Sequence, residues 1–429
     1  MAETVNPPNT HTANAQAPTV TVVRSIAELS NFEGSWDSLS SLADCTIFQT
    51  YDWNVARWKY FGGGTCLYCL IVKRGEAVVG IAPLQIENST LLGVRVASVV
   101  KFIFGDYINL IAAPEDFEVV LAAVLDHLIN NAPAWDIFEV NEINERYPLL
   151  KLLPEYLRER GMKHSLYRGN IFSRVQLPAS WEEFLQQSGG KFRHELKRKT
   201  DRMSEKFNVD VELITDGDKE VREAVESFAE IHGKRWRSLG YKSQFDNQTF
   251  RDFHVEVSQR LARKGSLRML FYRVNGERAA ASYNFIMGTT LYAYHANAFA
   301  SDEVMKYSPG FLLHCSAIRR AIDEGALVYD MLRGNESYKY VDFNCASSFN
   351  WQVRGISPSR AADIRYRLFT IIEFFSKVSS RLSAEFHSFK RFYVTRHPSP
   401  MTAVKRVLSQ MKGMVGLAGY FVKRSEGNS

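Results

Sequence analysis

Cysteine is scarce in this chain, and long hydrophobic runs are absent. Its 429 residues include five cysteines, a small and odd number that argues against a fold held together by disulfides. No uninterrupted apolar segment approaches the roughly 18–20 residues that a membrane-spanning helix needs. Residues 1–19 hold one acid and no Lys or Arg, so they lack the basic start and apolar core of a signal peptide. We therefore expect a cytoplasmic protein with a disordered lead-in over residues 1–19.

Metal-binding patterns are also weak. Cys66 and Cys69 form a Cys-x-x-Cys pair, but they lie in a strand-like apolar run with no second pair nearby. Buried cysteines explain this pattern better than zinc ligands do, so we predict no metal.

The net charge of +6 is concentrated at one end of the chain. Residues 360–429 contain thirteen Lys and Arg against four Asp and Glu, a net of +9, so the rest carries −3. Apolar residues recur there at helical spacing, which predicts a basic amphipathic helical tail over residues 357–429. Two interpretations stay open. Residues 360–429 make peripheral contact with an anionic membrane at its inner face or with an acidic partner, or they form a terminal hairpin packed on the main body.

The body of the chain contains a repeat. Residues 67–85 and 267–287 both have a hairpin pattern around a Gly-Glu turn, and each is followed by strands, a proline-opened helix and a further strand. The opening prolines, Pro114 and Pro309, precede Asp136 and Asp330 by 22 and 21 positions. These matches predict two copies of one α+β topology, each with a mixed central sheet flanked by helices. We place the copies at residues 20–177 and 178–356.

The most suggestive stretch for a binding site is 307–342, in the second copy. Tyr-Ser-Pro-Gly opens an apolar helix there, and a helix start presents unpaired N–H groups that suit a phosphate. A short strand follows and ends in ionisable side chains. The candidate anion site consists of Lys306, Ser308 and Gly310.

A basic segment lies between the copies. Residues 189–202 hold six Lys and Arg in a helix-like run. They form either a solvated helix face or an electrostatic site for an anionic substrate or for cofactor phosphates. In the second case Lys191 and Arg193 are binding candidates.

Several short motifs accompany the repeat. They are Phe48-Gln49, Asp52-Trp53, Trp58 and Ala82-Pro83-Leu84 in the first copy, and Lys191-x-Arg193, Lys197-Arg198, Trp236, Tyr329-Asp330-Met331-Leu332-Arg333-Gly334 and Tyr338-Lys339 in the second. With these motifs, residues 47–351 resemble the CelD-like (cellulose-biosynthesis-associated) acyltransferases of the GNAT superfamily and, more distantly, the Fem-type peptidyltransferases. The resemblance implies tandem GNAT-like domains and acyl-CoA, with acetyl-CoA expected, as co-substrate.

The resemblance also assigns the donor site. In GNAT proteins the pantetheine arm lies along a splayed strand, which here corresponds to 291–298 with Tyr292 and Tyr294. The pyrophosphate sits on the start of the next helix, which corresponds to Ser308-Pro309-Gly310. The usual Gln/Arg-x-x-Gly-x-Gly/Ala signature is reduced in this chain to Lys306 and Gly310.

The first copy differs at the equivalent turn. Glu115 and Asp116 stand where a phosphate would lie. We therefore expect the first copy to bind no CoA and to shape the acceptor cleft.

GNAT chemistry is usually direct transfer, which needs a base for the acceptor and a proton for the leaving thiolate. The candidate bases are Glu336, Asp330 and His295, and the candidate proton donor is Tyr338. By strand alternation His295 should face away from the tyrosines at 292 and 294, and a buried core histidine is its alternative interpretation.

Further candidates concern the substrates. Arg333 and Lys339 are expected to hold an anionic group. His232 and Trp236, one helix turn apart, are expected to line the acceptor pocket together with Trp53.

The leading hypothesis is an acyl-CoA-dependent acyltransferase that acts on an amine or hydroxyl of a small-molecule, sugar, lipid or polysaccharide-precursor acceptor. One alternative is a Fem-like peptidyltransferase that uses aminoacyl-tRNA. The other is a non-catalytic binding protein with a GNAT fold.

Overall fold

A computed structural model describes residues 17–43, 45–89, 94–99, 105–107, 109–130 and 135–372. The chain divides into one compact unit over Met1–Ala362 and a second over Asp363–Ser429. Most of the predicted lead-in (1–19) and of the predicted tail (357–429) lies outside the described residues, so what the sequence suggests for these segments stays a prediction. Among the residues described, no helix is both long enough and apolar enough to cross a bilayer.

The first half begins with a strand and three helices and then builds most of its sheet. The elements are β1 (Thr19–Val23), α1 (Ile26–Leu29), α2 (Glu33–Leu42), α3 (Tyr51–Phe61), β2 (Thr65–Arg74), β3 (Ala77–Ser89), β4 (Val94–Val99), β5 (Ile111–Ala112), α4 (Phe117–Asn130), β6 (Ile137–Asn144), α5 (Leu149–Glu159) and β7 (His164–Gln176). The predicted hairpin is confirmed, because β2 and β3 pair antiparallel around the turn at Gly75.

The second half repeats this order. After α6 (Trp181–Gln187) and α7 (Gly189–Lys206) come β8 (Val209–Ile214), α8 (Asp218–Ser238), α9 (Gln248–Arg263), β9 (Leu267–Val274), β10 (Glu277–Met287), β11 (Thr290–Ala298), α10 (Asp302–Met305), α11 (Pro309–Asp323), β12 (Val328–Arg333), α12 (Ser337–Val341) and β13 (Ala346–Ile356). The second predicted hairpin, β9–β10, is confirmed, as is the helix that Pro309 opens.

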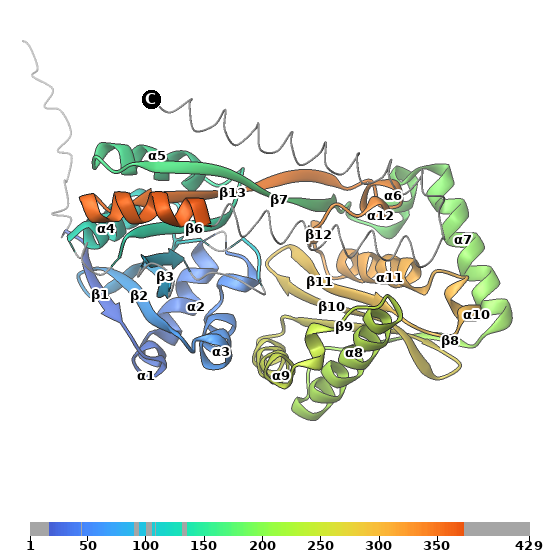
Figure 1. Ribbon diagram of the computed structural model, residues 1–429. Coiled ribbons are helices and arrows are strands. Elements are labelled where there is room, and N and C mark those ends of the chain that lie inside the picture. The colour runs from blue at the N-terminus through green and yellow to red at the C-terminus, as the bar shows by residue number, and fades with distance from the viewer. Residues whose placement is uncertain are drawn as a thin grey trace, which may run out of the picture. The chain divides into compact units, whose positions relative to one another are not determined.

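All these strands belong to one sheet, whose order shows the repeat and an exchange within it. The order is β1-β2-β3-β4-β6-β13-β7-β12-β11-β10-β9-β8, with β5 beside β3. Each half contains one parallel pair of strands, β4 with β6 in the first half and β11 with β12 in the second. The last strand of each half pairs with the other half: β7 beside β12 and β13 beside β6. Figure 1 shows β7 and β13 side by side across the junction. The predicted α+β class with a mixed sheet is confirmed.

The strand register corrects one detail of the repeat. Sequence spacing aligns Asp136 with Asp330, but β4–β6 pairs Ser98 with Glu139 where β11–β12 pairs Tyr292 with Asp330. Glu139 is therefore the counterpart of Asp330. The alignment was off by three residues mainly because α4 begins at Phe117, three positions after Pro114, whereas α11 begins at Pro309 itself. Pro114 therefore does not open its helix as predicted.

Helices cover both faces of the second-half strands. α11 packs on one face of β9–β11, whereas α8 and α9 pack on the other (Figure 1). The α8/α9 face joins the core of the first half through α3, which packs against α9. Trp53 of α3 lies fully buried in this shared core, 5.7 Å from Phe253 of α9 between ring centroids. The α8/α9 face therefore meets the first half.

Candidate functional site

The candidate site begins where β11 and β12 separate. Their parallel pairing covers residues 290–292 and 328–330 and then stops. At the same place β11 carries a bulge, since Ala293 pairs with Asn284 and His295 pairs with Tyr283, which leaves Tyr294 as the extra residue. A bulge re-aims the side chains around it. The pairing of the two strands thus ends at the bulge.

This bulge corrects the predicted alternation. His295 was expected to face away from Tyr294, but the two rings lie 4.4 Å apart between centroids. Tyr292 and Tyr294 also face the first half, each with its ring centroid 5.9 Å from that of Phe48. The extra residue cancels one step of the period of two. Three candidates that were expected on opposite faces therefore share one face.

Burial keeps His295 neutral. Its ring lies 5.9 Å from the ring of His232 and 6.4 Å from that of His254. Burial, with smaller effects from His232 and Arg333, lowers the pKa of His295 to about 3. A histidine with so low a pKa is a weak proton acceptor at neutral pH. Its geometry places it in the site, but its chemistry suits a neutral hydrogen-bonding or packing group.

His232 and Trp236 lie together, as expected of residues one helix turn apart. Their rings stack with centroids 5.5 Å apart and planes 16° from parallel. His232 Nδ1 lies 2.7 Å from the hydroxyl of Ser243, and burial lowers the pKa of His232 to about 4. Trp236 is 38% exposed. The stack therefore leads from His295 to the surface at the end of α8.

An aspartate of the first half completes the site, and sequence reasoning missed it. Asp106 Oδ1 lies 2.8 Å from Nε of Arg333 at the end of β12, and Arg333 Nη2 donates to the carbonyl of Gly105 at 3.1 Å. Burial raises the pKa of Asp106 to about 7, although Arg333 opposes the shift. The charges of Asp106 and Arg333 both act on the pKa of the Tyr294 hydroxyl, which burial raises well above its usual value. A carboxylate with a pKa near 7 suits a general base at neutral pH.

Asp330 serves as an anchor between the halves. Its side chain is fully buried, with Oδ2 2.7 Å from Nε of Arg174 on the exchanged strand β7. Its Oδ1 accepts hydrogen bonds from the Tyr107 hydroxyl at 3.2 Å and from the Leu332 amide at 2.8 Å. Burial raises the pKa of Asp330 against the opposing effect of Arg174. With both oxygens occupied, Asp330 holds β12, β7 and the loop at Tyr107 together.

The same anchor occurs in the first half. Glu139 of β6, the counterpart of Asp330, forms an ion pair with Arg354 of the exchanged strand β13, and both side chains are buried. A carboxylate–arginine pair thus joins each half to the strand it receives from the other. This repetition favours a structural role for Asp330 over the base that the sequence suggested.

Glu336 and Lys339 hold each other at the end of β12. Lys339 is 3% exposed, and its Nζ donates to the carbonyls of Met331 and Arg333, both at 2.9 Å. Glu336 Oε2 lies 3.1 Å from the same Nζ, and the Glu336 side chain is 55% exposed. The ammonium is occupied by the backbone. This arrangement argues against Lys339 as a substrate ligand and against Glu336 as the base.

Tyr338 lies on the other face of the sheet, beside α11. Its ring centroid lies 5.7 Å from that of His314 on α11. Burial raises the pKa of Tyr338 to about 12, so its hydroxyl stays protonated at neutral pH. This is the state that a proton donor needs.

The start of α11 offers fewer amides than a helix start usually does. Ser308 adopts a left-handed conformation, with φ of 54°, and its carbonyl accepts from the amides of Phe311 and Leu312. Pro309 has no N–H, so the Gly310 amide is the donor left for a ligand. A Cβ on Gly310 would meet Ala298 of β11 at 3.7 Å. The end of β11 and the start of α11 are thus adjacent, as a donor site requires.

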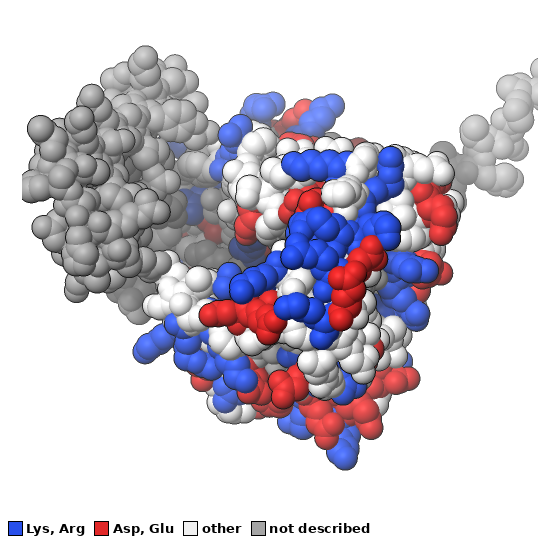
Figure 2. Space-filling view, turned by 90° about the vertical axis from the view of Figure 1, so that its right-hand side faces the viewer, with Lys and Arg blue, Asp and Glu red and all other residues white. Residues whose placement is uncertain are grey.

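Cations of α7 supplement this helix start. Lys199 Nζ lies 4.6 Å above the ring of Phe311, and the Arg202 guanidinium lies 5.8 Å above that of Tyr307. Lys306, on the turn itself, is exposed. Figure 2 looks onto this side of the molecule and shows Lys and Arg side chains gathered across its middle, with acids among them. The surroundings of the helix start are therefore basic.

Two predicted ligands lie at the far end of the same helix. Lys191 is exposed in the first turn of α7. Arg193 donates to the carbonyls of Leu185 and Gln186, at 2.8 and 3.2 Å, so its guanidinium links α7 to the end of α6. Within the described residues, neither side chain forms a hydrogen bond or ion pair with the residues around the β11 bulge. Their predicted substrate role stays a prediction.

Trp53 borders the site from below, in the core. Its ring centroid lies 5.4 Å from that of Tyr294 and 4.9 Å from that of Phe48. Being fully buried, it supports the bulge instead of meeting a substrate from solvent.

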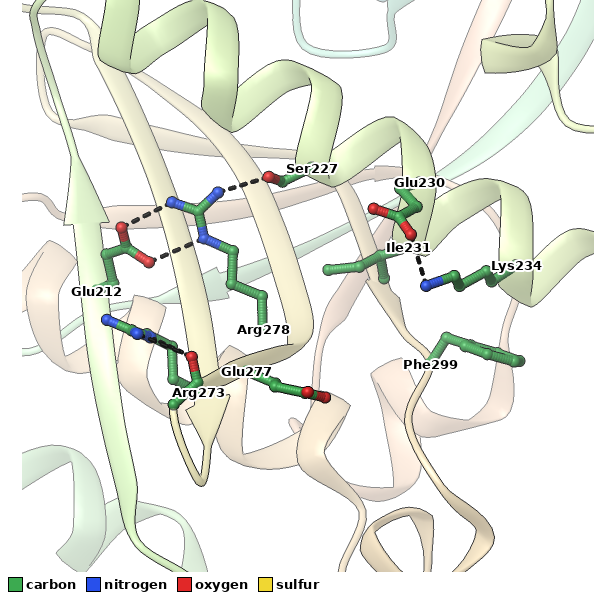
Figure 3. Close-up of a pocket in the computed structure, with 10 residues that line it drawn as sticks. Glu212, Ser227, Glu230, Ile231, Lys234, Arg273, Glu277, Arg278 and Phe299 are labelled. Atoms are coloured by element: carbon green, nitrogen blue, oxygen red, sulfur yellow. Dashed lines mark hydrogen bonds and ion pairs between the residues drawn. The ribbon is translucent and has the colours of Figure 1, made fainter.

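A polar cavity of about 530 Å³ is lined by residues of β8, α8, β9 and β10 and by Phe299 (Figure 3). Its charges pair within it: Arg278 bonds to Glu212 and to Ser227, and Lys234 Nζ lies 2.6 Å from Glu230. These pairs neutralise the lining, so we assign no ligand to the cavity. No group of three or more metal-ligating side chains occurs in the part of the chain that the structure describes.

Comparisons with known proteins agree with this geometry. Residues 190–340, which hold the bulge, the helix start and β12, match the acetyltransferase (GNAT) domain family, of CelD type. A search of curated proteins gave no match.

Solved structures add the fold. The crystal structure of FemX is 11% identical, with a TM-score of 0.56 over 75% of this chain and 95% of FemX. L-PGS from Bacillus licheniformis is 12% identical, with a TM-score of 0.48 over 79% of this chain and 95% of its own. A tandem GNAT protein from the clavulanic acid biosynthesis pathway is 13% identical, with a TM-score of 0.44 over 80% and 100%. The likeness to FemX supports the fold alone, and the other two scores are too low for argument.

Proposed function

We propose, from the GNAT domain match over residues 190–340, that this protein is an acyltransferase that uses acyl-CoA, with acetyl the expected group. It transfers the acyl group directly to an amine or hydroxyl of a small-molecule, sugar, lipid or polysaccharide-precursor acceptor. The observation that carries the proposal lies inside the matched segment: β11 and β12 part at a bulge, and α11 begins beside the end of β11.

The donor site consists of second-half residues. The Gly310 amide and the cations Lys199, Arg202 and Lys306 suit the phosphates of a CoA molecule. The unpaired edge of β11 beyond residue 292 suits its pantetheine arm. A thioester bound there supplies an activated acyl carbon, and the chain needs no nucleophile of its own.

The acceptor approaches from the α8/α9 face. There Asp106 accepts the proton of the acceptor amine or hydroxyl as that atom bonds to the acyl carbon. Arg333 holds Asp106 in place and can balance negative charge on the acceptor. Tyr338, protonated and on the opposite face, remains the candidate donor of a proton to the departing thiolate. His232 and Trp236 line the entrance.

A transfer assay tests the proposal. The protein is incubated with acetyl-CoA labelled in the acetyl group and with separate pools of amines, amino sugars and alcohols, and products are read by mass spectrometry. We expect one pool to gain the label, with one CoA released for each product. No labelled product from any pool, together with no binding of acetyl-CoA, would overturn the proposal.

A second candidate has one observation in its favour. α7 carries seven Lys and Arg against three acids, beside the same helix start, which suits a polyanionic donor such as aminoacyl-tRNA. Salt-sensitive binding of tRNA that competes with acetyl-CoA would favour this candidate. Binding of acetyl-CoA that tRNA does not affect would rule it out.

A further inference from the structure

An exposed aromatic and basic surface lies at the end of α8. Residues 234–242 read Lys-Arg-Trp-Arg-Ser-Leu-Gly-Tyr-Lys, with four cations and no acid. Trp236, Leu239 and Tyr241 are 38%, 45% and 47% exposed. The exposed leucines Leu42 and Leu327, by contrast, have no cation within three positions in the sequence. A group of three large apolar side chains within six residues calls for an explanation.

The backbone fixes this group in place. Gly240 has a φ of 80°, its amide bonds to the carbonyl of Arg237, and the Tyr241 amide bonds to the carbonyl of Trp236, both at 2.9 Å. This is the Schellman ending of a helix, in which a left-handed glycine closes the last turn. The ring centroids of Trp236 and Tyr241 lie 5.7 Å apart, the apolar contact that such an ending brings. Leu239 takes no part in that contact and is exposed between them.

Two of the four cations around this group are paired with acids. Lys234 pairs with Glu230 at 2.6 Å, and Arg237 pairs with Asp246 at 2.8 Å. Arg235 and Lys242 form no ion pair within the described part of the chain. Nearby His232 is neutral at physiological pH, because burial lowers its pKa. Two cations therefore remain available beside the apolar group.

We propose that residues 234–242 dock the protein on the surface of an anionic membrane. Trp and Tyr favour the headgroup level of a bilayer, where their rings are apolar and their N–H or O–H groups stay hydrated. Leu239 inserts beside them, and Arg235 and Lys242 meet anionic headgroups. A sugar or a nucleic acid base would stack on the faces of the aromatic rings and would not need an exposed leucine. The exposed Leu239 between Trp236 and Tyr241 therefore favours a lipid surface.

The docking surface adjoins the entrance of the candidate acceptor site, since Trp236 stacks on His232. A docked protein would therefore present that entrance to the membrane. The docking itself rests on exposure and charge, and it stands whether or not the proposed acyl transfer is correct.

Sedimentation with vesicles tests the docking. The full chain is mixed with vesicles of phosphatidylcholine, with and without phosphatidylglycerol. We expect binding to the anionic vesicles, a loss of about five-fold or more for Leu239→Glu, and a loss of about ten-fold or more for Arg235→Glu with Lys242→Glu. The matched controls are Leu327→Glu, at a leucine that is 54% exposed, and Lys219→Glu with Arg222→Glu, at the other end of α8. Both should bind as the parent does.

A local readout separates this surface from the basic residues beyond 372. Lipids brominated on their acyl chains quench a tryptophan that enters the bilayer, so they should quench the parent and not Trp236→Phe. The proposal fails if the variants bind as their controls do, if no quenching depends on Trp236, or if heparin binds the surface while anionic vesicles do not. Thermal melting of each variant excludes misfolding as the cause.

Discussion

Replacement of Asp106 by asparagine separates catalysis from stability at the candidate site. The substitution keeps the shape of the side chain and removes its charge and its capacity to accept a proton. We expect kcat to fall about 100-fold or more, because a positioned acid–base group contributes about 10²–10⁴-fold. Binding of acetyl-CoA should persist, since Asp106 belongs to the acceptor side in the proposed arrangement.

The effect on stability has the opposite sign. The pKa of Asp106 is raised from 3.8 to about 7 by burial, so the folded protein binds more protons than the unfolded chain between about pH 4 and pH 7. Stability contributed by this group is therefore lost as the pH rises through that window. The ionised carboxylate costs on the order of 4 kcal/mol above pH 7, at about 1.4 kcal/mol for each pH unit. Asparagine avoids this cost.

The partner left behind does not cancel the gain. The Arg333 side chain is 40% exposed, so water can hydrate its guanidinium once Asp106 is neutral. Asp106→Asn should thus match or exceed the parent in stability above pH 7, by up to about 4 kcal/mol. The difference should shrink toward pH 5, where the parent carboxyl is protonated.

Two measurements check this prediction. The first is the pH dependence of kcat/KM, which reports the free enzyme; it should rise in the parent with a midpoint near the pKa of about 7 and lose that rise in the variant. The second is urea unfolding on both sides of pH 7. Asp52→Asn is the matched control, because Asp52 is also buried in the first half and lies 2.7 Å from Nζ of Lys264. It should lose stability and keep kcat.

Refutation would be clear. If Asp106→Asn loses stability above pH 7 as Asp52→Asn does, the carboxylate is a structural ion-pair partner. If its kcat and pH profile match those of the parent, Asp106 is not the base.

Three further predictions concern the two anchors, the Glu336–Lys339 pair and the buried histidines. Asp330→Asn and Glu139→Gln should each lower the free energy of unfolding, measured in urea, by about 3–5 kcal/mol, because each leaves an arginine more buried than Arg333 without its anion. Glu139→Gln should keep kcat. A loss below about 1 kcal/mol in either variant would contradict the paired anchors. Lys339→Met should also lower the free energy of unfolding, by about 3 kcal/mol. Glu336→Gln, at an exposed side chain, should change kcat less than about two-fold. A large loss of kcat in Glu336→Gln would restore Glu336 as a base candidate. Burial lowers the pKa of His295 to about 3 and also lowers the pKa values of His232 and His254. The unfolded chain therefore binds more protons at these histidines than the folded chain does, and stability should fall as the pH drops below about 6.5. An unchanged unfolding midpoint at pH 5 would contradict this.

Local patterns explain what could be predicted from the sequence. The hairpins at Gly75 and Gly276 and the helix at Pro309 were predicted correctly because turn residues and hydrophobic periodicity act over a few neighbours. Two copies of the same pattern then indicated the duplicated α+β topology. His232 and Trp236 followed from helix spacing.

The site itself depended on features without a local signal. The bulge at Tyr294 inserts one residue into an otherwise regular alternation, so the facing of His295 was wrong. The pairing of β7 and β13 with the opposite halves depends on contacts between segments more than 150 residues apart in the chain, which no strand pattern encodes. The boundary predicted after residue 177 stays a prediction, although this exchange crosses it.

Asp106 was missed for a related reason. It is a single acid between glycine and tyrosine in an apolar stretch, with no motif around it. Its partner Arg333 lies 227 positions later in the sequence, so the pair appears only when the halves meet. The one available signal was a lone acid flanked by apolar residues, which indicates a buried carboxylate that needs a cationic partner.

The number of acetyl-CoA molecules bound per chain tests the central claim most directly. Equilibrium dialysis with labelled acetyl-CoA would be applied to the parent, to Gly310→Asp in the second half and to Glu115→Lys at the equivalent turn of the first. Aspartate at 310 fits sterically, since its Cβ meets only an ordinary contact at Ala298, but it places a negative charge at the phosphate site. We predict one molecule per chain for the parent and for Glu115→Lys, and a loss of binding for Gly310→Asp. No binding by the parent, two molecules per chain, or unchanged binding by Gly310→Asp would contradict a single donor site at the start of α11.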